Sequence, residues 1–99
     1  MRVKVTLNVA ADADVRTDIV DNLTDVSVEY VNEDDDTVED VLDVEYVEHT
    51  PITGGQTIVT LDIDDSDAPD DVVVNALTEE FEEDRWEGLG IKAESVKNS

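Results

Sequence analysis

The chain has 99 residues, no cysteine and a formal net charge of −22, because 28 acidic residues face only six basic ones. This length fits a single domain over residues 1–99, and the missing cysteines exclude disulfides, thiolate metal sites and cysteine nucleophiles. So few Lys and Arg residues argue against a nucleic-acid or anionic-membrane partner, and the short apolar runs exclude a membrane span.

The first ten residues predict the strand around which the rest of the chain is organised. Four apolar residues from Val3 to Val9 alternate with polar ones. This period of two is typical of a strand with one buried and one wet face. Arg2 and Lys4 fall on the wet face.

A short helix is predicted over 13–23. Its apolar residues recur at spacing four from Val15 to Leu23, which gives one buried stripe. Asp12 or Asp14 is the expected N-cap.

The middle of the chain predicts further strands. Apolar residues alternate over 26–31. Residues 37–48 fit either one helical turn followed by a strand or a strand throughout, and their valines favour mainly strand. A loop over 49–56, with its turn at Gly54, then leads into a strand over 56–64, so that the two segments form a hairpin.

A second helix and a last strand complete the prediction. Pro69 suits the first turn of a helix, and apolar residues at spacing four continue the helix to about Trp86. One of the following glycines ends it. Alternation over 91–97 then predicts the final strand.

The predicted order is strand, helix, strand, strand, strand, helix, strand (β-α-β-β-β-α-β). With right-handed crossovers, this order favours an α+β fold, namely a ferredoxin-like two-layer sandwich with one extra strand. Its mostly antiparallel sheet would carry two helices on one face. The first and last strands would be neighbours in this sheet.

The aspartate clusters do not match a calcium-binding EF-hand loop. Windows starting at Asn32 and Asp62 lack both the turn glycine and the bidentate glutamate. A solvated acidic loop is the favoured interpretation, so no metal and no cofactor are expected. The alternative is a weaker cation site made by Asp64, Asp65, Asp67 and Asp70.

No catalytic set of residues is present in the sequence, so we expect that the protein is not an enzyme. His49 is the only histidine, and it has no nucleophile in a suitable context nearby. It is expected to be an exposed residue in a loop. The glycine pairs lack the Lys and Ser or Thr of a phosphate-binding loop.

Four of the six basic residues are expected to gather on the open face of the sheet. Arg2 and Lys4 lie on the wet side of the first strand, and Lys92 and Lys97 belong to the last strand beside it. One interpretation is local neutralisation by acidic residues on neighbouring strands. The other is that this group binds an acidic surface of a protein partner or of a second copy.

Trp86 and Arg85 form a further candidate pair for partner binding. Trp86 lies off the apolar stripe of its helix, so it is either a lid over the edge of the core or an anchor at a protein interface. Trp and Arg are both enriched at binding hot spots.

The charge of −22 predicts that the protein works in a high-salt environment. The Asp-rich, Lys-poor composition resembles that of proteins from extremely halophilic archaea. Carboxylates on a folded chain of this size stand about 14 Å apart, whereas the Debye length is about 8 Å at physiological salt and about 3 Å at 1 M. High salt is therefore expected to be required for stability, in the cytoplasm of a halophilic host or in a virion.

These observations favour a non-enzymatic structural or interaction subunit of a halophilic archaeon or its virus. It would act through protein–protein assembly, for example as a virion component, and a homo-oligomer is expected. The alternative is a small-ligand-binding regulatory module of the ferredoxin-like type. A minor alternative is an acidic mimic of nucleic acid.

Overall fold

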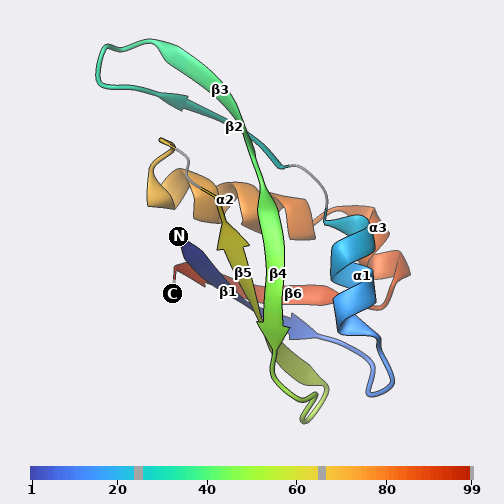
Figure 1. The fold of residues 1–99 in the computed structure, drawn as a ribbon. Coiled ribbons are helices and arrows are strands. Elements are labelled where there is room, and N and C mark those ends of the chain that lie inside the picture. The colour runs from blue at the N-terminus through green and yellow to red at the C-terminus, as the bar shows by residue number, and fades with distance from the viewer. Residues whose placement is uncertain (24–25, 65–66, 99) are drawn as a thin grey trace.

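The computed structural model describes residues 1–23, 26–64 and 67–98. These residues form a small mixed α+β structure with antiparallel sheets and three helices (Figure 1). In chain order the elements are β1 (Arg2–Asn8), α1 (Val15–Asn22), β2 (Val26–Val31), β3 (Thr37–Leu42), β4 (Val44–His49), β5 (Gln56–Ile63), α2 (Asp70–Phe81), α3 (Asp84–Gly88) and β6 (Lys92–Asn98).

The main sheet has the strand order β4-β5-β1-β6, and each neighbouring pair is antiparallel. The first strand is central, as the sequence predicts, because β1 pairs with β5 on one side and with β6 on the other. Val5, for example, lies opposite Val59 and also opposite Val96. The expectation that the first and last strands are neighbours is confirmed.

The second sheet is a separate two-stranded hairpin of β2 and β3. The sequence predicts instead that all strands share one sheet and that residues 37–48 form one element, and both predictions are wrong. The segment is strand throughout, as its valines favour, but it is interrupted at Asp43. Its first half, β3, pairs with β2, and its second half, β4, pairs with β5. Strand β2 lies outside the main sheet because its buried side, with Val26 and Val28, packs where the hairpin contacts α2.

The core lies between the main sheet and the helices. The apolar side of β1 is completely buried, and the stripes of both long helices pack into the same cluster of buried residues. This burial of apolar surface is the main stabilising contribution to the fold. The cluster joins the following residues of β1, α1 and α2: Val3, Val5, Leu7, Val15, Ile19, Val73, Leu77 and Phe81.

The first helix lies within the predicted range but begins two residues later, at Val15, and Asp14 is its N-cap. The Asp14 carboxylate accepts hydrogen bonds from the backbone N–H and the hydroxyl of Thr17, at 3.3 and 2.9 Å. These bonds satisfy a helix N–H group that has no partner within the helix.

The second helix is shorter than predicted. It ends at Phe81, and the short helix α3 follows after the extended backbone of Glu83. In a straight helix the Trp86 side chain would lie off the buried stripe and would be exposed to water, so the break allows this large apolar side chain to reach the core. After the break the Trp86 side chain is fully buried.

The β4–β5 hairpin is closed by the glycine turn that the sequence predicts. Thr53 and Gln56 exchange two backbone hydrogen bonds of 2.9 and 3.1 Å. Gly54 and Gly55 between them have φ angles of +61° and +76°. Two left-handed residues in succession match the type I′ turn that fits the twist of paired strands.

Candidate interaction surfaces

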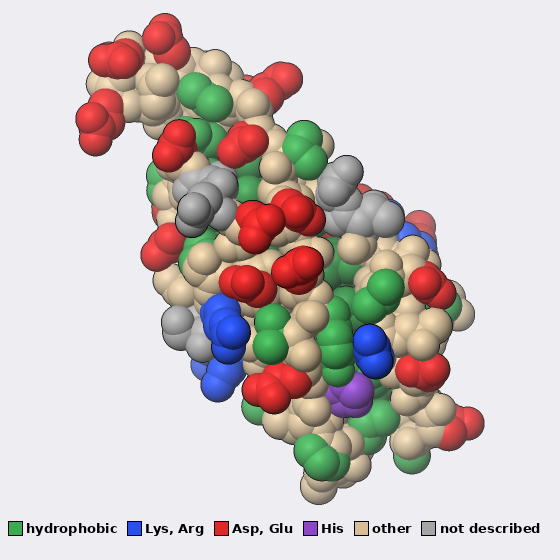
Figure 2. Space-filling view, viewed as in Figure 1, with side chains coloured by type: hydrophobic (Ala, Val, Ile, Leu, Met, Phe, Trp, Pro, Cys, Tyr) green, Lys and Arg blue, Asp and Glu red, His purple; other side chains and the backbone are tan. Residues whose placement is uncertain are grey.

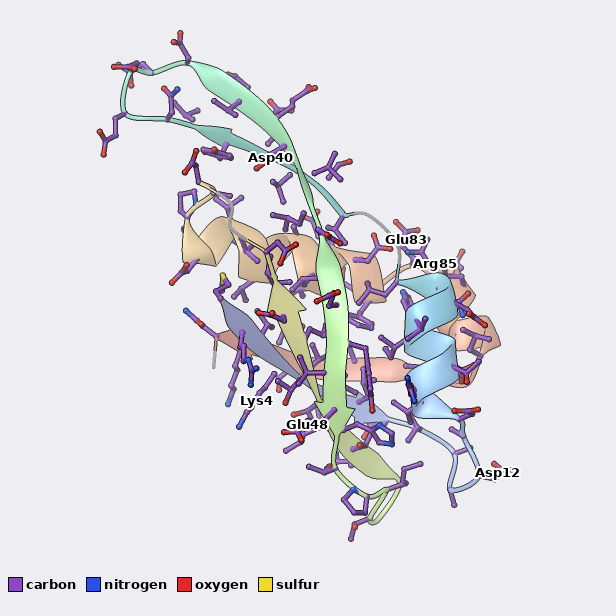
Figure 3. The ribbon with its side chains drawn as sticks, in the orientation of Figure 1. Lys4, Asp12, Asp40, Glu48, Glu83 and Arg85 are labelled. Carbon is purple, nitrogen blue, oxygen red and sulfur yellow. The ribbon has the colours of Figure 1, made fainter. Side chains whose placement is uncertain are left out.

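Four basic side chains lie on the open face of the main sheet, opposite the helices. The strand register places Lys4 directly across from Lys97, and Asn8 across from Lys92. Arg2 is two residues from Lys4 and shares its side of β1. All four basic side chains are exposed, and we call them the basic face. Figure 3 shows Lys4 pointing away from the helices, and basic side chains gather at the corresponding edge of Figure 2.

The basic face has no carboxylate close enough for an ion pair in the part of the chain that the structure describes. Among the described residues, the one ion pair with N···O within 4.0 Å joins Arg85 to Glu80. Of the acidic residues on neighbouring strands, Asp62 lies directly across from Arg2. The Glu94 carboxylate accepts a hydrogen bond of 2.5 Å from Gln56. Lys4 and Lys97 therefore form a cross-strand pair of like charges, which is unfavourable unless an anion lies nearby.

The basic face also has an apolar neighbour. Ile58 lies opposite Thr6 in the main sheet and is 40% exposed. Thr60, on the same side of β5, is buried. The open face therefore combines the basic side chains and an exposed aliphatic side chain with the carboxylates of Asp62 and Glu45, which lie in line with Arg2. Such a mixed surface suits contact with another protein.

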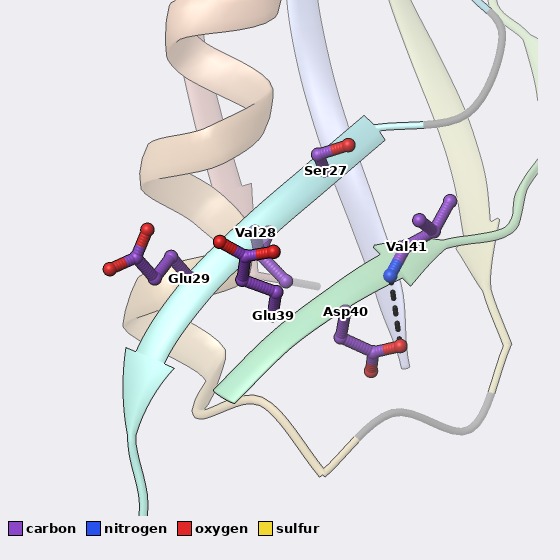
Figure 4. Close-up of a pocket in the computed structure, with 6 residues that line it drawn as sticks. All are labelled: Ser27, Val28, Glu29, Glu39, Asp40 and Val41. Atoms are coloured by element: carbon purple, nitrogen blue, oxygen red, sulfur yellow. Dashed lines mark hydrogen bonds between the residues drawn. The ribbon is translucent and has the colours of Figure 1, made fainter. Parts of the chain in front are cut away.

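The outward side of the β2–β3 hairpin forms a second surface, which we call the hairpin face. Glu29 and Glu39 lie directly opposite each other at its centre, and Figure 4 shows both side chains in the shallow hollow of this region. Val31 and Val41 are 60% and 57% exposed. The six exposed side chains of the hairpin face are Ser27, Glu29, Val31, Thr37, Glu39 and Val41.

The tip of this hairpin is held by local hydrogen bonds. The side-chain oxygen of Asn32 accepts from the backbone N–H groups of Asp34 and Asp36, at 2.9 and 3.0 Å. Asp35 takes the left-handed conformation, with a φ of +60°, which aspartate adopts more readily than most residues. The turn thus presents an acidic sequence on a defined backbone.

Trp86 and Arg85 lie in the core and at its margin, apart from the basic face. The indole N–H of Trp86 donates to the carbonyl oxygen of Glu80 at 2.9 Å, and its ring packs on Phe81 with centroids 4.8 Å apart. Arg85 pairs with the Glu80 carboxylate and lies over the Trp86 ring. The placement is that of a lid over the core, and the buried indole offers no surface to a partner.

A group that the sequence did not indicate joins Arg16, Tyr46 and His49. The Tyr46 hydroxyl is hydrogen-bonded to Nδ1 of His49, and the Arg16 guanidinium lies 6.0 Å from the Tyr46 ring centroid. His49 is therefore a half-buried residue at the end of β4 rather than an exposed residue in a loop. Residues three apart on a regular strand point to opposite faces, but a register shift between Tyr46 and Glu48 brings both rings to one face.

Two carboxyl groups meet where β3 passes into β4. The backbone N–H of Asp64 donates to the carbonyl oxygen of Asp43 at 3.1 Å. A hydrogen bond between the Asp43 and Asp64 side chains, together with their charge repulsion, raises the pKa of Asp64 above 3.8. Of the weak cation site considered from the sequence, Asp65 lies outside the described residues. The described residues contain no group of three or more side chains that could hold a metal ion.

Comparison of the chain with protein-family models, with curated proteins and with solved structures found no match. Within the described ranges, no helix is long and apolar enough to cross a membrane. The case for a function therefore depends on the surfaces of the chain itself.

Proposed function

We propose that this chain is a non-enzymatic structural or interaction subunit that acts through protein–protein assembly in a halophilic archaeon or its virus. The observation that supports this proposal is the basic face. In a chain with a net charge of −22, its four cations stand without a carboxylate within 4.0 Å among the described residues. Such cations are available to acidic groups of a partner, and complementary charge steers and orients association.

We further propose that the fold is a ferredoxin-like two-layer sandwich with the β2–β3 hairpin inserted between α1 and β4. The strand order β4-β5-β1-β6 supports this classification. So does the packing of α1 and α2 into one core with the apolar side of β1. A two-layer sandwich leaves the other face of its sheet uncovered, and the basic face lies on this uncovered side.

The proposed setting is the cytoplasm of a halophile or a virion assembled there. The support comes from the acidic composition. Two chains of this charge repel each other strongly at low ionic strength. At 1 M salt the Debye length falls to about 3 Å, so repulsion between distant carboxylates is screened and association becomes possible.

Charge reversal on the basic face tests the proposal. Lys4→Glu and Arg16→Glu change the net charge equally, and both side chains are exposed, but only Lys4 belongs to the basic face. In 3 M KCl we expect Lys4→Glu to weaken association at least tenfold in sedimentation equilibrium and to keep the wild-type circular dichroism spectrum. Arg16→Glu should associate like the wild type. Equal effects of the two variants would contradict the proposal, because total charge rather than the basic face would then govern association.

A small-ligand regulatory module is the second candidate function. It is supported by a hollow between α1 and β4, whose lining includes Arg16, Ile19, Leu23 and Tyr46. A ligand that binds only the folded state raises the melting temperature. A thermal-shift screen with amino acids and nucleotides in 3 M KCl therefore tests this candidate, and no shift at millimolar ligand would reject it for those compounds.

A further inference from the structure

We propose that the partner of the basic face is the hairpin face of a second copy of this chain. This inference rests on the proposed function and names the partner. It follows from three properties of the two surfaces: their charges, their apolar side chains and their positions on opposite sides of one molecule.

The cross-strand charge pairs of the two surfaces match in sign and in spacing. Lys4 faces Lys97 across the β1–β6 pair, and Glu29 faces Glu39 across the β2–β3 pair. Directly opposite residues in antiparallel strands have Cβ atoms about 4.5–5.5 Å apart, so each lysine can meet one glutamate. Each pair is unfavourable alone because its charges are alike. Contact between the surfaces removes both repulsions at once.

The apolar side chains of the two surfaces also match. On the hairpin face, Val31 and Val41 lie at opposite ends, and the Glu29–Glu39 pair lies between them. Both valines are more than half exposed, and Ile58 on the open face of the main sheet is 40% exposed. Face-to-face contact of two sheets would interleave such side chains and remove them from water.

The layering of the molecule keeps the hairpin face of a chain away from the basic face of the same chain. The inward side of the hairpin, including Val28, is buried where β2 contacts α2. Helix α2 in turn packs on the side of the main sheet opposite the basic face. The hairpin face therefore points away from the main sheet (Figure 4). Only another copy can supply it, in a head-to-tail contact that repeats unless it closes into a ring.

Molar salt favours this contact rather than abolishing it. At a Debye length of about 3 Å, the mutual repulsion of two chains with a charge of −22 each is screened beyond direct contact. Lysine and glutamate groups that become buried in the contact are screened much less, because water and ions are excluded around them. Apolar contact does not weaken with added salt.

Two double variants test the contact. Lys4→Glu/Lys97→Glu reverses the basic face, and Glu29→Lys/Glu39→Lys reverses the hairpin face. In 3 M KCl we expect each variant alone to associate at least tenfold more weakly than the wild type in sedimentation equilibrium. An equimolar mixture should recover wild-type association, because every basic face in the mixture can then meet a hairpin face of opposite charge.

The control is Glu79→Lys/Glu82→Lys, which makes the same charge change as the hairpin variant at exposed positions in and just after α2. This variant should associate like the wild type. Circular dichroism checks that each variant is folded, and Lys4→Gln/Lys97→Gln replaces the glutamate variant if that one unfolds.

The outcomes separate this inference from the proposed function. If only the basic-face variant loses association, or if the mixture does not recover it, the hairpin face is not the partner. The proposed function then still stands with a different acidic surface as partner. A wild-type chain that is strictly monomeric and binds no other protein in 3 M KCl overturns both.

Discussion

At the scale of single residues, the Asp43–Asp64 pair gives the clearest prediction of pH dependence. The side-chain hydrogen bond between them requires a proton, and it raises the pKa of Asp64 above 3.8. Because this folded-state pKa is raised, the folded chain binds the proton more tightly than the unfolded chain. The contribution of this site to stability is therefore fully present below the ordinary aspartate pKa of 3.8, and it is lost as the pH rises through the folded-state pKa.

We expect an NMR titration of the Asp64 carboxyl in 3 M KCl to show a midpoint above 3.8. Asp43→Asn should lower this midpoint, because it removes the repelling charge and its amide can donate to the Asp64 carboxylate. Asp70→Asn, at an exposed position on α2, is the matched control and should leave the Asp64 midpoint unchanged. An Asp64 midpoint that Asp43→Asn does not move would show that the pair is not in contact.

Single residues also show where sequence reasoning stops. The burial of β1 from Val3 to Leu7 follows directly from the alternation. The burial of Trp86 does not follow from helical spacing, because it depends on a break after Phe81 that neither glycine nor proline marks. The contact of Tyr46 with His49 likewise depends on a strand irregularity, and a period-two pattern assumes that there is none.

At the scale of elements, the β4–β5 turn gives a prediction with a matched control. Gly54 has a φ of +61°, whereas Gly88 lies in α3 without a positive φ, and a Cβ added at either glycine would meet no atom within 4 Å. Gly54→Ala should destabilise the fold by about 1–2 kcal/mol, since an L-residue is strained in the left-handed region.

Gly88→Ala should be neutral or stabilising by up to about 1 kcal/mol, because alanine favours the helix. Urea unfolding of both variants at a constant 3 M KCl measures the two effects. Equal free energies of unfolding for the two variants would contradict the conformational argument.

The strands and helices were largely predictable, but the assignment of strands to sheets was not. Alternation over 26–31 and 37–48 indicates which side chains are buried, and β2 and β3 follow that alternation. Alternation within a strand does not indicate which other strand it pairs with. The same pattern fits a strand in the main sheet and a strand whose apolar side packs on α2, so the separate hairpin emerged only from the structure.

The basic face was likewise predictable only in part. Period two and the neighbouring positions of β1 and β6 placed Lys4 and Lys92 on one face from the sequence alone. Lys97, five residues after Lys92, shares that face because the register shifts between Thr6 and Leu7, which no alternation pattern indicates. That the basic face lacks carboxylate partners depends on the positions of all neighbouring acidic side chains in the described structure. No sequence pattern specifies those positions.

At the scale of the whole molecule, charge density dominates. An accessible surface of 6139 Å² carries most of the charge of 28 acidic residues. We expect the chain to lose its fold in dilute buffer and to regain it in molar KCl, because screening reduces the repulsion within the compact state. Circular dichroism along a KCl series measures this, with sucrose as a non-ionic control. Equal stability in dilute buffer and molar KCl, or equal rescue by sucrose, would contradict the role of charge screening.

The most direct test of the account is the mass of the wild-type chain in solution. Multi-angle light scattering in 3 M KCl should give a mass that is a multiple of 10.9 kDa and that increases with protein concentration. A mass of one chain at every concentration, with no other protein bound, would contradict the claim that this chain acts through assembly.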